Sequence, residues 1–202
     1  MQTYPFTLDP GAVVGATLFN DWTYSPVKNA LPDAAAKVKE GVPGRGALEG
    51  ELEYYASASK ALAALGVPQP PPAAFAMAGF TVPDAPKIVV SPFFANSFED
   101  WRAAFPTPAA ISISTRSALL LPGRGRVVFH ALQLDGALEI VACEGARVAV
   151  KSLRVANAGL AFEPLGEGAA APDWQKIRGF TVARKEMRTL RFDAPGEYEV
   201  AE

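Results

Sequence analysis

The stretch ISISTRSALLLPGRGRVVFHALQLDGALEIVACEGARVAV, residues 111–150, decides the fold class of the second half of this chain. Apolar and polar residues alternate there in short runs, which is the pattern of strands with one buried face. Turn residues separate the runs about every ten residues. The runs are Ile111/Ile113, Leu119/Leu121, Val128/His130/Leu132/Leu134, Leu138/Ile140/Ala142 and Val148/Val150.

From residue 111 onward the sequence therefore predicts an all-β region. The recurring turns fit an antiparallel meander or a short β-solenoid whose coils stack in register, and the local pattern does not decide between the two. We expect a last hairpin of Phe180–Val182 with Leu190–Phe192, and a return of the chain through Tyr198 and Val200 after the Pro195–Gly196 turn.

Residues 1–66 have the pattern of α/β structure. The apolar run Val13–Asn20 predicts a strand that is buried on both faces, as in a parallel sheet. A short helix is expected from Pro32 to Lys39, and a longer one from Leu48 to Leu62, closed by Gly66. One strand and two helices do not complete a domain, so this stretch should expose apolar surface unless further strands cover it.

Residues 67–110 are predicted to be a connector. Nine prolines remove backbone donors too often for long regular elements. A short strand at Lys87–Val90 is compatible with this spacing. Ser97-Phe-Glu-Asp100 predicts a capped helix that continues through Trp101 to Phe105.

Composition limits the classes of function. The 202 residues carry a net charge of -2, and no basic stripe with interleaved aromatic residues indicates nucleic-acid binding. The only cysteine cannot form an intrachain disulfide, and no apolar run approaches the roughly 18 residues that a membrane span requires. We expect a cytoplasmic protein that binds neither nucleic acid nor membrane.

The most informative motif lies at residues 24–29, Tyr-Ser-Pro-Val-Lys-Asn, a lysine-bearing turn after the predicted strand. Further motifs flank it in a fixed order along the chain. They are Met1–Pro5, Asp33–Lys37, Glu49–Glu53, Ser114–Ser117, Leu134–Leu138, Ile177–Phe180 and Pro195–Gly196.

Taken together, these motifs resemble the late catalytic segment and C-terminal region of UDP-sugar pyrophosphorylases, the broad-specificity uridylyltransferases. The resemblance covers most of residues 1–66 and 111–202. It implies that residues 1–66 end a Rossmann-like nucleotidyltransferase domain, that 67–110 connect, and that 111–202 form a β-helix-like domain. Of the two alternatives for the β region, it favours the solenoid.

The resemblance also implies a reaction: UTP and a monosaccharide 1-phosphate give a UDP-sugar and pyrophosphate. Lys28 is the catalytic and substrate-binding candidate, because the family's lysine in this turn contacts the nucleotide phosphates. Asn29 would bind substrate or orient the loop. Mg²⁺ is implied by the reaction class, without ligands that can be located in this chain. Family members carry a Gly-rich UTP loop upstream, so we expect the missing N-terminal part as a partner and no turnover by residues 1–202 alone.

Other interpretations of these residues remain. Lys28 is alternatively a solvated loop lysine, and Asn29 serves its own turn. Arg116, Arg124 and Arg126 are expected in turns rather than in an anion site, because the strand-to-helix context is lacking. His130 and Cys143 are expected to be strand residues without a catalytic role, and Glu49, Glu51 and Glu53 point to different helix faces.

A function of another class is also compatible with the sequence. Residues 111–202 can be interpreted as a non-catalytic β-solenoid module for interaction or assembly, with residues 1–66 as an accessory patch.

Overall fold

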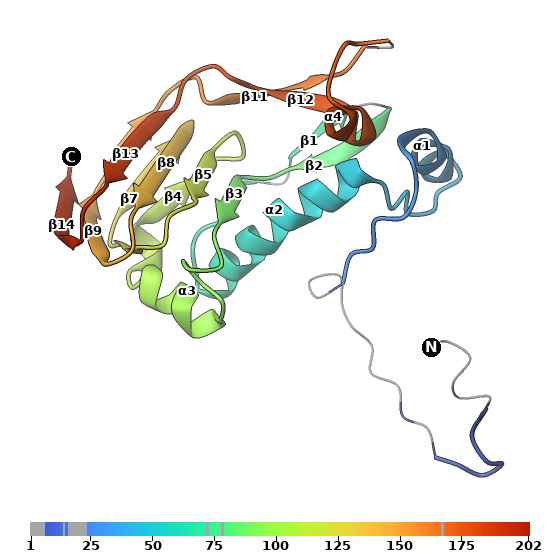
Figure 1. Ribbon diagram of the computed structural model, residues 1–202, viewed down its shortest axis with the longest axis horizontal. Helices are drawn as coiled ribbons and strands as arrows, with labels where there is room; N and C mark the ends of the chain where they lie inside the picture. The colour runs from blue at the N-terminus through green and yellow to red at the C-terminus, as the bar shows by residue number, and fades with distance from the viewer. Residues whose placement is uncertain (1–6, 14, 16–23, 72, 78, 167) are drawn as a thin grey trace.

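The computed structural model describes residues 7–13, 15, 24–71, 73–77, 79–166 and 168–202 (Figure 1). It contains β-strands in parallel and antiparallel sheets together with a few helices. The described helices are α1 (Leu31–Lys39), α2 (Ala47–Ala64), α3 (Phe98–Ala104), α4 (Asp173–Arg178) and a 3₁₀ turn at Pro108–Ala110. The predicted strand Val13–Asn20 lies outside the described residues, apart from its first position and Gly15.

Most strands belong to three parallel sheets, whose orders are β10-β7-β4, β13-β8-β5-β3 and β14-β9-β6. We call the strands of these three sheets the strand stack, and β3 lies at one edge of it. Its members are β3 (Lys87–Val90), β4 (Ile111–Ile113), β5 (Ala118–Leu121), β6 (Arg126–Phe129), β7 (Leu132–Asp135), β8 (Ala137–Ala142), β9 (Ala146–Ser152), β10 (Arg154–Ala156), β13 (Arg188–Phe192) and β14 (Gly196–Ala201).

Consecutive strands of the stack visit the three sheets in a repeating order. The strands β4, β5 and β6 lie in three different sheets, β7 to β9 follow the same order, and β10, β13 and β14 follow it again. Ile111 pairs with Leu132, and Val127 pairs with Val148, in parallel register. An antiparallel meander is therefore wrong for these strands, because each pairs in parallel with a strand one circuit away.

The alternating sequence pattern explains the interior of the stack. Ile111, Leu132 and Leu138 are at most 1% exposed, and their polar neighbours along the strands face outward. One expected run is corrected: β6 ends at Phe129 and β7 begins at Leu132, so Val127 and Phe129 are buried, rather than Val128 and His130. The chain bends between the two strands, which shifts the phase of the alternation.

Helices cover one end of the stack. Helix α2 packs on β3, and α3 packs on β6. The Phe105 ring stacks on Phe129 at a centroid distance of 5.1 Å, and Trp101 stacks on Phe105 at 6.0 Å. The predicted capping box of α3 is confirmed, since the Ser97 hydroxyl accepts from the Asp100 amide. The Asp100 carboxylate accepts hydrogen bonds from the Asn96 backbone amide and from the hydroxyl and backbone amide of Ser97. These bonds, with that of Asn96 first, lower the pKa of Asp100.

Residues 67–110 contain more structure than the proline content predicts. The strand at Lys87–Val90 is confirmed and joins the stack beside β5. Strands β1 (Ala73–Met77) and β2 (Phe80–Asp84) form an antiparallel hairpin that was not predicted. Pro83 is compatible with β2 because this two-stranded sheet leaves each strand one unpaired edge.

Between β10 and β13 the chain leaves the stack, as the orange segment in Figure 1 shows. This excursion holds β11 (Leu160–Pro164), α4 and β12 (Phe180–Arg184). The all-β prediction is therefore wrong at α4. The hairpin of Phe180–Val182 with Leu190–Phe192 is also wrong, because β12 pairs with β11, whereas β13 pairs in parallel with β8.

The excursion contributes to a second hydrophobic cluster. Phe180 is fully buried among Ala34 of α1, Leu48 of α2, and residues of the β1–β2 hairpin. Arg178 of α4 donates from one guanidinium nitrogen to both carboxylate oxygens of Glu51 at 3.1 Å. The interior of the stack and this second cluster each contain residues from all three predicted stretches. The boundaries of those stretches at residues 66 and 110 stay a prediction. No described helix is long and apolar enough to cross a membrane.

Candidate functional site

The segment that carries Lys28 is fixed through its backbone to the loop between α1 and α2. The Lys28 amide donates to the Arg45 carbonyl at 2.9 Å, and the Asn29 amide donates to the same oxygen at 3.2 Å. The Asn29 side chain adds a third contact, because its amide nitrogen donates to the Gly44 carbonyl at 2.6 Å. These contacts hold residues 28 and 29 against residues 44 and 45, which are distant in sequence.

The partner loop is itself held by the first turn of α2. Glu49 accepts from the amides of Gly44 at 3.1 Å and Gly46 at 2.9 Å. Arg45, between the two glycines, has a φ of 57°, in the left-handed region that a non-glycine residue rarely adopts. A Cβ at Gly44 would contact the Glu49 carboxylate and the Ala34 carbonyl, so this position requires glycine. Residues 44–46 thus form a tight loop that depends on glycine at position 44.

This arrangement determines which groups can meet an anion. The Gly44 and Gly46 amides, which would otherwise favour an anion at the start of α2, already bind the Glu49 carboxylate. Binding of an anion therefore depends on side chains. Lys28 is exposed, and no hydrogen bond or ion pair of its ammonium group occurs within the described part of the chain. A fixed backbone and an exposed ammonium group suit a phosphate contact.

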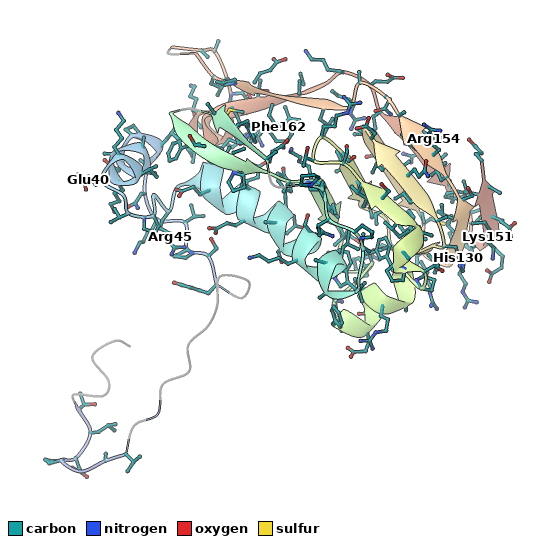
Figure 2. All side chains as sticks on the ribbon, turned by 180° about the vertical axis from the view of Figure 1, so that it is seen from behind. Glu40, Arg45, His130, Lys151, Arg154 and Phe162 are labelled. Carbon is teal, nitrogen blue, oxygen red and sulfur yellow. The ribbon has the colours of Figure 1, made fainter. Side chains whose placement is uncertain are left out.

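Two further cations belong to the same loop system. Lys37 of α1 donates to the Asn29 side-chain oxygen at 3.1 Å, so it supports Asn29 and is half-buried. Arg45 lies on the segment between α1 and α2, as Figure 2 shows. Sequence reasoning missed Arg45. The glycines on both sides of it were the available signal, but only the folded chain brings its backbone beside Lys28.

The side-chain hydrogen bonds of Asn29 favour a positioning role, which was the alternative to ligand contact. Its side chain links Gly44 to Lys37, which uses one amide donor and its oxygen. Its role in substrate binding stays a prediction.

The remaining candidates lie elsewhere, and several have partners of their own. Figure 2 shows His130 and Arg45 on opposite sides of the molecule. Arg116 binds the Asp135 carboxylate at 2.5 Å and, ahead of Ser114, lowers the pKa of that group. Arg124 pairs with Glu144, and its guanidinium lies 4.4 Å from the Phe93 ring centroid.

One further correction concerns Cys143, whereas the acidic residues of α2 agree with the prediction that they lie on different helix faces. Cys143 is half-buried and follows β8 in a turn, where the sequence suggested a buried strand residue. Glu49 and Glu51 bind different partners, the loop amides and Arg178. Among the described residues, no three His, Cys, Asp or Glu side chains gather in a way that could hold a metal ion. The part of the chain that the structure describes therefore offers no ready-made site for Mg²⁺.

Comparison with known proteins links this chain to one group of enzymes. UDP-sugar pyrophosphorylase of Arabidopsis thaliana is 33% identical over 202 residues, which is 99% of this chain and 32% of that protein. The proteins of the same name from Oryza sativa subsp. japonica and subsp. indica are each 32% identical over 194 residues, 95% of this chain and 31% of theirs. No family model matches the chain.

The resemblance inferred from the motifs is thus confirmed: the chain is a relative of the UDP-sugar pyrophosphorylases. It spans about a third of the length of the curated relatives it matches.

Proposed function

From this kinship we propose that the chain forms part of a nucleotidyltransferase that transfers uridylyl groups from UTP to monosaccharide 1-phosphates. The products are a UDP-sugar and pyrophosphate. The observation that carries the proposal is the exposed ammonium group of Lys28 on a backbone fixed by Arg45 and Asn29. The 33% identity over nearly the whole chain supports the reaction class.

The reaction gives Lys28 a defined role. A sugar 1-phosphate oxygen attacks the α-phosphorus of UTP in line, a new P–O bond forms, and the bond to the departing pyrophosphate breaks. Negative charge spreads over the nonbridging oxygens in the transition state. A preorganised ammonium group stabilises that charge by about 3 kcal/mol. Asn29 is a positioning residue in this scheme, because it acts on the loop that carries Lys28.

The proposal also includes a complementary protein part, a metal ion and a location in the cell. Binding of the uridine and the sugar is assigned to protein that corresponds to the two thirds of the relatives outside the match. Exposed apolar side chains near the site support such a neighbour, since Tyr24 is 65% and Val27 is 54% exposed. Mg²⁺ belongs to the proposal through the reaction class, and a cytoplasmic location belongs to it as well.

The proposal also assigns a domain type to the strand stack. Its three sheets are visited in a repeating order, with each strand in parallel register with the strand one circuit away. We assign it to a β-helix-like C-terminal domain that carries the excursion back to α2. In this proposal the domain supports the Lys28 loop indirectly, because Phe180 packs with residues of α1 and α2 and Arg178 binds Glu51 of α2.

The test uses a chimera in which residues 1–202 replace the matching segment of the Arabidopsis relative. Pyrophosphate release from UTP and glucose 1-phosphate is measured for the chimera and for its Lys28→Met variant. We expect kcat to fall about 100-fold, with a smaller change in KM, because the lost interaction acts in the transition state. Residues 1–202 alone should release no pyrophosphate.

Lys39→Met is the matched control, since Lys39 is an exposed lysine in the last turn of α1. It should leave kcat unchanged. Unchanged kinetics in Lys28→Met would refute the role of Lys28. Turnover by residues 1–202 alone would refute the need for a complementary part.

A further inference from the structure

Arg45 has a backbone conformation that its own contacts do not explain. Alone among the non-glycine residues that the structure describes, it has a positive φ. A side chain in this left-handed region crowds its own backbone, so the residue costs free energy unless another interaction compensates. Glycine occupies positions 44 and 46 on either side, but position 45 carries a long cationic side chain. The compensating interaction should therefore involve the guanidinium group.

The described part of the chain does not supply that interaction. Arg45 is half-buried, and its side chain makes no hydrogen bond, ion pair or ring contact with a residue that the structure describes. The Glu49 carboxylate accepts instead from the amides of Gly44 and Gly46. The charge of Arg45, like that of Lys28, is therefore available to a ligand.

Backbone hydrogen bonds bring the two cations together. The amides of Lys28 and Asn29 both donate to the Arg45 carbonyl, so residues 28 and 45 are neighbours although they are far apart in the sequence. Lysine supplies a point charge, whereas the planar fork of arginine matches two oxygens of one phosphate. The pair suits a ligand that carries adjacent phosphate groups.

We propose that Arg45 binds the pyrophosphoryl group of UTP, next to the α-phosphate that Lys28 contacts. The assignment has the proposed function as its premise. Two groups flank the α-phosphorus during the reaction, the sugar 1-phosphate and the pyrophosphate, and the pyrophosphate carries the larger negative charge. It therefore gains most from a guanidinium group, and its binding compensates the strained backbone of Arg45.

Arg45→Gly separates a role in ligand binding from a role in the structure. Glycine adopts the left-handed conformation without strain, and it keeps the carbonyl that accepts from Lys28 and Asn29. Titration calorimetry of residues 1–202 with sodium pyrophosphate measures the dissociation constant directly. We expect this constant to rise about tenfold in the variant, because one bidentate contact to a charged group is lost. The melting temperature without ligand should not fall.

The chimera gives an independent measurement. In Arg45→Gly, the KM for UTP should rise about tenfold, whereas the KM for glucose 1-phosphate should stay unchanged. Arg45→Lys keeps the charge and loses the fork, so the KM for UTP should rise by about threefold. Lys39→Met is the control for the loss of a nearby exposed cation, and it should alter neither KM nor the dissociation constant of pyrophosphate.

Three results would overturn the role of Arg45. They are an unmodified chain that does not bind pyrophosphate, an Arg45→Gly variant with an unchanged dissociation constant, and a rise in the KM for glucose 1-phosphate in place of that for UTP. A lower melting temperature in Arg45→Gly would assign the guanidinium group to the loop and would also count against the proposal. The proposed function fails separately. Unchanged kinetics in Lys28→Met refute that function, whereas an impaired Lys28→Met beside an unaffected Arg45→Gly refutes only the role of Arg45.

Discussion

The strand stack and the loop that carries Lys28 are stabilised in different ways. The stack buries aliphatic and aromatic side chains between three sheets, and its strands pair with partners one circuit away. The loop buries little, and three hydrogen bonds to residues 44 and 45 fix its backbone. Global stability should therefore reside in the stack, whereas the position of Lys28 should depend on a few polar contacts.

The largest expected effect is in the stack. Leu138 of β8 is fully buried between β5 and β13, so Leu138→Ala leaves a cavity that neighbouring strands fill poorly. We expect the free energy of unfolding to fall by about 3 kcal/mol in urea denaturation. Glu139→Ala, the next residue with its side chain on the outer face, should change it by less than about 0.5 kcal/mol. Equal losses would contradict the assignment of stability to the inner face.

The second prediction concerns the ion pair that joins the excursion to α2. The side chains of Arg178 and Glu51 are 13% and 24% exposed, and Arg178 also lies over the rings of Phe180 and Trp174. Arg178→Leu leaves the Glu51 charge in a partly buried position and should cost about 2 kcal/mol. A double-mutant cycle with Glu51→Gln, followed by urea denaturation, measures the coupling. Lys176→Leu in the same helix breaks only an exposed pair and should cost less than about 0.5 kcal/mol.

Tyr55, which lies beside this ion pair, makes the stability of the fold depend on pH. Burial, and then the hydrogen bond of Tyr55 to Glu51 at 2.6 Å, raise the pKa of Tyr55 above its ordinary value of 10.0. The unfolded chain then loses this proton before the folded chain does. The associated stability is complete below pH 10 and is lost as pH rises above 10 toward the folded pKa. Tyr55→Phe should remove that loss.

The two regions also differ in how far the sequence predicts them. Helix α2 was predicted because Leu48, Leu52 and Leu62 recur at helical spacing, and α3 because Ser97 caps it, and both signals are local. The partner of β13 was not predicted, because β8 lies about 50 residues away and alternation specifies a face rather than a partner. The excursion was missed as well, since α4 has only six residues.

The candidate site shows the same limit. The sequence identified Lys28 through its motif, but the motif does not reveal what holds the lysine in place. Gly44-Arg-Gly46 has the composition of any tight loop, and its carbonyls become partners of residues 28 and 29 only when α1 and α2 are packed. Long-range contacts through backbone atoms leave no pattern in side chains.

The smallest expected effect on stability, and the most specific to the site, comes from Asn29→Ala. It removes the donor to Gly44 and the acceptor for Lys37, both partly buried, and should cost about 1 kcal/mol of unfolding free energy. In the chimera, Asn29→Ala should lower kcat severalfold, whereas Leu138→Ala should leave kcat unchanged, because only the change at Asn29 displaces Lys28. Asn96→Ala, at an exposed asparagine before α3, should alter neither quantity. If Leu138→Ala and Asn29→Ala changed kcat equally, the loop would not be separable from the stack, and the contrast between the two regions would fail.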